Sequence, residues 1–273
     1  MIEVSNLKGV QMKSTLSFVL LAMLSFACAH KKPAPKETYT PVMSYEMEGV
    51  KYESTVQIPK GMKDKVPLVI VVHEWWGRTP YIMDRARMLN DQGFATLPID
   101  LYGNGKTVET PPEAMALAAP FYKTPQIGIE RLNKYVELAK KDPHVDATKV
   151  YVIGFCFGGT QALNLARSGA DVKGVVSIHG GLASTVASKE IKADVLVLHG
   201  GADPMVPKKE LQAFEREMKT VKAGYRVVTY PGAKHAFTNP KATEVGKKYN
   251  IPIAYNKAAD EAAWQELLKF LKQ

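Results

Sequence analysis

Residues 150–159 read VYVIGFCFGG, an apolar run that ends in a glycine turn with Cys156 at its centre. A short run rich in Val and Ile is typical of a buried parallel strand, and residues 157–168 have a helical pattern. In a Gly-x-Cys-x-Gly turn between strand and helix, a nucleophile occupies a sharp bend where side chains two positions away would clash. Cys156 would begin the helix, where the helix dipole favours a thiolate. A small buried cysteine beside a glycine turn would have the same sequence, so other parts of the chain are needed to distinguish a nucleophile from a structural cysteine.

On both sides of this turn, short apolar runs alternate with helical stretches. The runs expected to be strands are Leu68–Val72, Ala95–Ile99, Val150–Ile153, Val175–Ile178, Val195–Leu198 and Arg226–Tyr230. The expected helices are Tyr81–Gln92, Gln126–Lys141, Phe157–Ser168, Lys208–Lys222 and a last one with the apolar stripe Trp264, Leu267, Leu268 and Leu271. This alternation predicts an α/β fold: a mostly parallel sheet with helices on both faces. Residues 44–49 and 51–59 are expected to form an N-terminal antiparallel hairpin.

Ligands of such sheets bind beyond the carboxyl ends of the strands, and two further loops at this edge carry chemistry. Residues 199–204 read HGGADP and residues 231–237 read PGAKHAF. Nucleophile, acid and histidine in this order, each just after a strand, follow the chain order of α/β-hydrolases. Asp203 would orient His235, and His235 would act as the base for Cys156. Asp203 could instead be a helix cap.

A fourth loop, residues 73–77, reads HEWWG. We expect it to supply the second backbone N–H of an oxyanion hole, from Trp75, beside the N–H of Phe157. The loop superficially matches a zinc-binding His-Glu-x-x-His motif, but Gly77 stands where the second histidine must be, so we expect no metal. There is no glycine-rich phosphate loop, and we expect no cofactor.

Together these loops resemble the dienelactone hydrolase family from about residue 44 to the C-terminus. The matching pieces are HE at 73–74, PIDLY at 98–102, GFCFGG at 154–159, HGGAD at 199–203 and HAF at 235–237. The resemblance implies cofactor-free lactone hydrolysis by a triad of Cys156, His235 and Asp203. It also implies that Glu74 lies beside the resting thiol and moves when substrate arrives.

The sequence departs from the family where the substrate carboxylate is held. Family members that act on dienelactone carry two arginines, and here the corresponding positions are Asn104 and Asn239. Neutral amides cannot replace a bidentate guanidinium pair, so dienelactone itself is not the expected substrate. The substrate pocket is expected to comprise Trp76, Tyr102, Asn104, Phe237 and Asn239, with the aromatic side chains either lining it or packing beneath it.

Composition excludes several other classes of protein. The 273 residues are 46% hydrophobic and 23% charged, which is globular, and two cysteines cannot make a disulfide scaffold or a four-cysteine zinc site. The formal charge of +9 comes from scattered Lys and Arg, so we expect no nucleic-acid partner. The oligomeric state cannot be predicted.

The N-terminal sequence indicates export. Residues 1–29 are expected to be an extension plus a signal peptide, residues 30–43 a polar tether, and residues 44–273 a single domain. Ordinary cleavage after Ala29 would release the protein, whereas cleavage before Cys28 would leave a lipidated cysteine; an uncleaved anchor is the third alternative. We expect a periplasmic or membrane-anchored lipoprotein of a bacterium, in which Cys156 is the only cysteine able to act as a thiol.

The sequence therefore predicts a hydrolase that acts on small esters or lactones. A thioesterase or other acyl hydrolase of the same fold is an alternative. A catalytically silent binding protein of the cell envelope is another, although the complete set of Cys156, His235 and Asp203 speaks against it. A thiol redox protein is disfavoured because no partner cysteine would remain.

Overall fold

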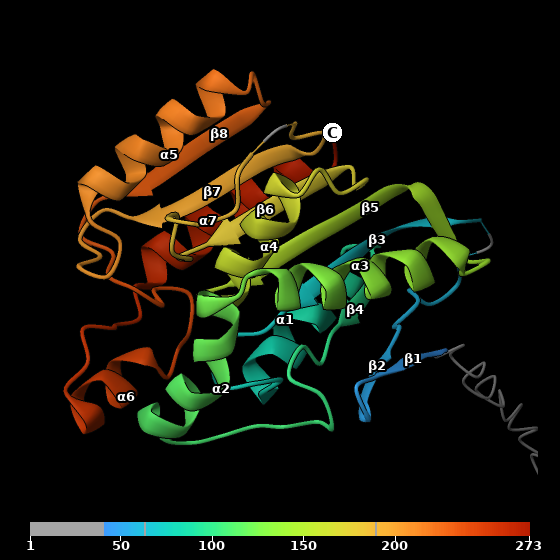
Figure 1. Cartoon of the computed structure of the whole chain (residues 1–273), viewed down its shortest axis with the longest axis horizontal. Helices are drawn as coiled ribbons and strands as arrows, with labels where there is room; N and C mark the ends of the chain where they lie inside the picture. Colours follow the sequence, from blue (N-terminus) through green and yellow to red (C-terminus); the bar gives the residue numbers. More distant parts are fainter. Residues whose placement is uncertain (1–40, 63, 189) are drawn as a thin grey trace, which may run out of the picture. The chain divides into compact units, whose positions relative to one another are not determined.

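The computed structural model describes residues 41–62, 64–188 and 190–273. Six parallel strands form the main sheet in the order β4-β3-β5-β6-β7-β8 (Figure 1). Their bounds are β3 (Val66–Val72), β4 (Ala95–Pro98), β5 (Val145–Phe155), β6 (Gly174–Ile178), β7 (Asp194–Gly200) and β8 (Tyr225–Tyr230). The predicted parallel α/β sheet is confirmed.

An antiparallel pair, β1 (Val42–Met47) and β2 (Val50–Thr55), precedes the main sheet and confirms the expected hairpin. Glu48 and Gly49, which join the strands, both have positive φ, as a tight two-residue hairpin turn requires. β1 begins at Val42, slightly inside the segment 30–43 that was expected to be a tether.

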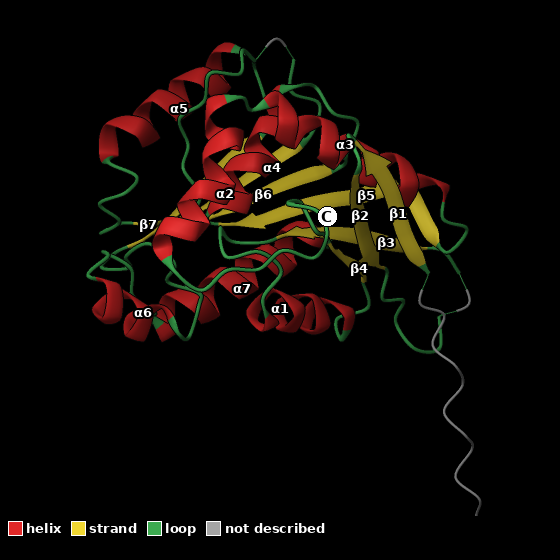
Figure 2. Cartoon of the chain, turned by 60° about the horizontal axis from the view of Figure 1, so that its bottom comes forward, coloured by secondary structure: helices red, strands yellow, loops and turns green. Residues whose placement is uncertain are grey.

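Seven helices complete the part of the chain that the structure describes. They are α1 (Pro80–Asn90), α2 (Pro111–Lys123), α3 (Gln126–Lys141), α4 (Phe157–Arg167), α5 (Lys208–Thr220), α6 (Ala242–Tyr249) and α7 (Lys257–Leu271). Helices cover both faces of the sheet (Figure 2). Buried side chains of α3, α4 and α5 share one core cluster, and those of α1 and α7 share the other.

Along a strand, buried side chains point alternately to the two faces of the sheet. In β3, Leu68, Ile70 and Val72 enter the core cluster beneath α3 and α4. Val69 and Val71 enter the cluster beneath α1 and α7. Successive side chains of a strand point to opposite faces, so a strand covered on both sides must be apolar throughout.

Two helices were not predicted, and their sequences explain why. α2 begins with Pro111-Pro112 and contains Pro120, which look like helix breakers. Proline is tolerated in the first helical turn, however, and a capping box between Thr110 and Glu113 fixes that end. α6 has only eight residues and ends at Asn250, which has a left-handed backbone. Neither segment carries a long helical period of apolar residues.

The signal peptide, the Cys28 lipid site and most of the tether lie outside the described residues. Export and lipidation therefore stay predictions. Within the described ranges, no helix combines the length and apolar character that crossing a membrane requires.

Candidate active site

Cys156 lies in a strained turn between β5 and α4. Its backbone has φ 52° and ψ −117°, a conformation that costs a non-glycine residue about 1–3 kcal/mol. The flanking glycines make the turn possible, because a Cβ on Gly154 would lie 2.0 Å from the carbonyl oxygen of Gly158. A Cβ on Gly158 would in turn lie 2.5 Å from the carbonyl oxygen of Val72. The turn is therefore locked sterically around the cysteine.

A continuous hydrogen-bonded chain joins the sulfur to a buried carboxylate. His235 Nε2 lies 3.0 Å from Cys156 Sγ, and His235 Nδ1 lies 2.8 Å from Asp203 Oδ2. The other carboxylate oxygen, Oδ1, accepts from the backbone N–H of Met205 at 2.8 Å, which fixes the carboxylate. Cys156, Asp203 and His235 follow β5, β7 and β8, parallel strands whose carboxyl ends lie at one edge of the sheet. Asp203 is thus bonded to the histidine and does not cap α5.

The electrostatics of this chain favour a proton on the histidine. Burial alone would lower the pKa of His235, but the Cys156 sulfur and the Asp203 carboxylate outweigh it and raise the pKa to about 10. An imidazolium is then present at neutral pH with its Nε2–H directed at the sulfur. This is the arrangement that a cysteine nucleophile needs.

Glu74 is buried near this chain, and its carboxyl is hydrogen-bonded to a neighbour. Asn239 donates to Glu74 Oε2 through its side-chain N–H at 2.7 Å. Burial raises the pKa of Glu74 to about 7, although the Asn239 amide and the His235 cation act in the opposite direction. Asn239, one of the two expected substrate-clamp positions, therefore positions a carboxyl group.

We predict that Glu74→Gln stabilises the protein at alkaline pH and not at acid pH. Between the ordinary pKa of 4.5 and the raised one near 7, the unfolded chain releases the Glu74 proton while the folded protein keeps it. The free energy of unfolding of the wild type therefore falls as pH rises through this window. At pH 8 the glutamine variant should gain up to about 3 kcal/mol over the wild type, and almost nothing at pH 4.5.

Urea unfolding at the two pH values measures this difference. Glu130→Gln, on the exposed face of α3, is the matched control and should change neither value. An equal gain for Glu74→Gln at both pH values would contradict a buried, proton-retaining carboxyl.

Two backbone N–H groups beside the sulfur are available to hold an oxyanion. Phe157 is the first residue of α4, where N–H groups have no intrahelical acceptor. Neither the Phe157 N–H nor the Trp75 N–H pairs with an acceptor among the described residues. His73 supports the second group: its Nε2 accepts from the Leu101 N–H at 3.3 Å, so its Nδ1 carries the hydrogen that the Glu74 carbonyl accepts.

The sulfur opens onto a cavity of about 370 Å³. Its walls are mostly apolar and aromatic, with Trp75, Trp76, Met115, Tyr122, Met205 and Ile251 among them. Glu74, Cys156, Phe157 and His235 line the same cavity. Nucleophile, base and the two N–H donors thus face one space of a size suited to a small substrate.

With this geometry established, similarity to known proteins can be stated. The sequence pattern of the dienelactone hydrolase family matches residues 53–273. The chain belongs to the dienelactone hydrolase family. In the crystal structure of a dienelactone hydrolase-like promiscuous phosphotriesterase from metagenomic libraries, 97% of that chain matches 85% of this one, with 28% identity and a TM-score of 0.79.

Two curated relatives span nearly the full length. A Salmonella typhimurium protein provisionally named a carboxymethylenebutenolidase is 24% identical over 91% of this chain and 95% of its own. The Aquifex pyrophilus protein named usf is 26% identical over 85% of this chain and 97% of its own. The protein is thus a hydrolase of the dienelactone hydrolase type.

Four residues expected in the substrate pocket of this family member do not line the cavity around Cys156. Tyr102 is buried beneath it, where its hydroxyl donates to the Trp75 carbonyl at 2.9 Å. Phe237 is fully buried in the core under α7, and Asn104 lies on the surface against β2. Asn239 faces Glu74 instead. The order of residues along the chain predicted the loops, but not the direction of each side chain within them.

The structure also reveals a buried histidine that was not predicted to belong to the site. His179 follows β6, and its Nδ1 accepts at 3.1 Å from the backbone N–H of Cys156, which it shares with the Ile178 carbonyl at 3.0 Å. Nδ1 must therefore be unprotonated, which leaves Nε2–H to donate to Thr238 Oγ1 at 2.8 Å. Burial, followed by the nearby His235 cation, lowers the pKa of His179 and keeps it neutral. Its position just after a strand, like that of His235, was the available signal.

We expect His179→Leu to lower kcat by about 10–100-fold with little change in KM, because it removes the side-chain acceptor that helps to hold the Cys156 turn. His179→Asn should recover most of kcat, since asparagine keeps an acceptor and tolerates the positive φ of 43° found here. Steady-state kinetics on both variants, with thermal unfolding as a check, measure this. Equal losses in the two variants would contradict a positioning role.

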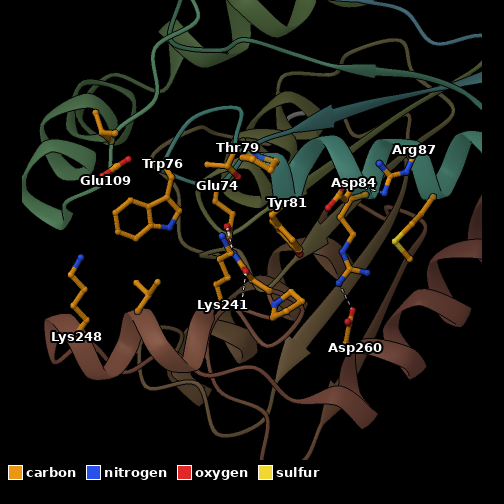
Figure 3. Close-up of a pocket in the computed structure, with 17 residues that line it drawn as sticks. Glu74, Trp76, Thr79, Tyr81, Asp84, Arg87, Glu109, Lys241, Lys248 and Asp260 are labelled. Atoms are coloured by element: carbon orange, nitrogen blue, oxygen red, sulfur yellow. Dashed lines mark hydrogen bonds and ion pairs between the residues drawn. The ribbon is translucent and has the colours of Figure 1, made fainter.

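A second cavity, of about 870 Å³, shares Glu74 and Trp76 with the first (Figure 3). It is lined by four basic side chains, Arg85, Arg87, Lys241 and Lys248, and by four acidic ones, Glu74, Asp84, Glu109 and Asp260. Arg85 is paired with Asp260 at 2.7 Å, and Arg87 with Asp84 at 3.0 Å. Lys and Arg side chains therefore line this second cavity, with acidic side chains among them, and not the cavity around Cys156.

Proposed function

We propose that this protein hydrolyses small esters or lactones, with Cys156 as the nucleophile and an acyl-cysteine as the intermediate. The observation that carries the proposal is the unbroken chain from Asp203 through His235 to Cys156, ending in a largely apolar cavity. Within the described residues, no group of three or more His, Cys, Asp or Glu side chains is placed to hold a metal ion.

In the first half of the reaction, the Cys156 sulfur attacks the ester carbonyl carbon and a C–S bond forms. The carbonyl electrons move to the oxygen, which the N–H groups of Trp75 and Phe157 stabilise. As the carbonyl re-forms, the C–O bond to the leaving group breaks, and His235 delivers its proton to the departing alkoxide.

In the second half, water hydrolyses the thioester. His235, now neutral, takes a proton from the water as the hydroxyl oxygen attacks the acyl carbon. The C–S bond breaks, the acid leaves, and the sulfur again faces an imidazolium. Asp203 stabilises that cation in both halves.

The relatives support this reaction class, while the residues at two positions narrow the substrate. The Salmonella relative is provisionally named for cleavage of a carboxylated lactone. In this chain, Asn239 is engaged with Glu74 and Asn104 with β2, so neither binds a substrate carboxylate. We therefore propose that the substrates are not anionic at the position that the family arginines serve.

A panel of short-chain aryl and alkyl esters, lactones and thioesters tests the proposal, using a chain that begins at residue 30. Intact-mass spectrometry after rapid acid quenching should show one acyl group per chain, located on Cys156 by peptide mapping. Turnover of an ester or lactone without any acyl adduct would argue against covalent catalysis. No turnover with any class would favour a binding protein. Preferred turnover of thioesters would identify the alternative acyl hydrolase.

A further inference from the structure

We propose that the catalytic cavity selects substrates that carry a positive charge, such as esters of quaternary-ammonium alcohols. This inference rests on the proposed ester hydrolysis and adds the substrate class. It follows from the charge, the fixed carboxylate and the aromatic walls of the cavity around Cys156.

Among the described residues that line this cavity, none is Lys or Arg. The ionisable groups there are Cys156 and His235, which are hydrogen-bonded to each other, together with Tyr122 and two carboxyl groups, Glu74 and Glu210. Asp203 adds a buried negative charge behind His235. The protein as a whole has a formal charge of +9, so a cavity lined by no Lys or Arg is a local departure from its basic character.

Glu210, in the first turn of α5, presents a carboxylate that is fixed in place. Its Oε1 accepts from the backbone N–H groups of Leu182 at 2.5 Å and Ala183 at 2.8 Å. No described side chain forms an ion pair with it. The carboxylate is thus oriented by the backbone and not neutralised by a cation, so it can attract a positive group on a ligand.

Aromatic and thioether side chains complete the wall. Trp75 and Trp76 pack edge to face with ring centroids 5.0 Å apart, and Tyr122 lines the same cavity. Aromatic rings beside a carboxylate are the surroundings that bind quaternary ammonium groups, because the ring faces carry partial negative charge and accept a weakly hydrated cation. A substrate carboxylate would instead face Glu210 with no lysine or arginine in the cavity to pair with.

The basic residues that could reverse this preference are engaged or lie elsewhere. Arg78 donates to the carbonyls of Glu53 and Pro98 and does not line the cavity. Lys241 and Lys248 line the second cavity, beyond Glu74 and Trp76. An anionic substrate would have to extend into that second cavity to find a lysine or arginine.

Three matched butyrate esters test the proposal: those of choline, of 3,3-dimethylbutanol, which is its neutral isostere, and of 4-hydroxy-2,2-dimethylbutanoate, which is anionic. We expect kcat/KM for the choline ester to exceed that for the neutral ester by about ten-fold or more, with the anionic ester slowest. Glu210→Gln keeps the acceptor for Leu182 and Ala183 but removes the charge, so it should lower the choline-to-neutral ratio at least three-fold. Glu109→Gln, in the second cavity, is the control and should leave the ratio unchanged.

A choline-to-neutral ratio near one, or a preference for the anionic ester, would overturn the proposal. If no ester is hydrolysed, the proposed function fails, and calorimetric titration still tests the selectivity. Phenyltrimethylammonium should then bind more tightly than benzoate to the wild type, and Glu210→Gln should weaken its binding. Equal or tighter binding of benzoate would overturn the inference on its own.

Discussion

Cys156→Ala should reduce kcat/KM for the best ester by about 10⁴-fold or more, because no other group in the cavity can form the acyl intermediate. The fold should persist: alanine is smaller than cysteine, and Gly154 and Gly158 still permit the turn. Initial rates by a chromogenic ester assay, with thermal unfolding on the same samples, measure both quantities. The effect should fall on kcat, since the cavity walls that bind the substrate are unchanged.

Cys156→Ser is the matched control for this variant. A serine hydroxyl fits the turn, but it offers His235 a neutral partner where the imidazolium now faces a sulfur. It should therefore retain only a small part of the rate while binding substrate normally. If Cys156→Ala kept wild-type turnover on every ester, the nucleophile would be misassigned, and a binding function for this cavity would become the leading explanation.

Asp203→Asn should lower kcat by up to about 10⁴-fold, the loss known for the corresponding change in serine triads. The Met205 N–H already bonds Oδ1, so an asparagine would keep its oxygen there and turn its NH₂ toward His235. The histidine would then accept at Nδ1 and carry its only hydrogen on Nε2, which leaves no lone pair to take a proton. Substrate binding should survive, so KM should change little.

The pH–rate profile separates this effect from a general loss of structure. With the carboxylate gone, His235 loses a partner that helps to raise its pKa, so the alkaline limb should move to lower pH. Asp142→Asn, a buried carboxyl at the end of α3 away from the cavity, is the control and should keep the wild-type profile. An Asp203→Asn enzyme with full kcat would show that His235 does not depend on this carboxylate.

Chain order alone predicted which loops meet. Cys156, Asp203 and His235 each follow a strand, and the carboxyl ends of parallel neighbours must lie at one edge of the sheet. The need for glycine around Cys156 could also be predicted from the sequence. A Cβ at Gly154 or Gly158 would lie only 2.0–2.5 Å from a backbone oxygen. The parallel sheet and the hairpin could also be predicted, since buried strands and two-residue turns have strong local sequence patterns.

The sequence could not predict the direction of individual side chains or the contacts between distant segments. Phe237 and Tyr102 follow the expected strands, yet packing turns them into the core, and the sequence has no marker for that choice. The bond between Asn239 and Glu74 joins residues 165 positions apart, so no local pattern could predict it. Glu210 looked like an ordinary surface residue of α5, because its link to residues 182–183 depends on how two loops fold together.

The contrast between α4 and α2 bears on how this enzyme could acquire new specificities. Every residue of α4 is buried, so the nucleophile is carried by a segment in which almost any change disturbs the core. Met115 and Tyr122 of α2, and Met205 before α5, line the cavity but are partly exposed to solvent. A library confined to these three positions can vary the substrate while the free energy of folding stays nearly constant. Natural divergence and laboratory evolution can both follow this route, in which the residues lining the cavity change while the segment that carries the nucleophile stays the same.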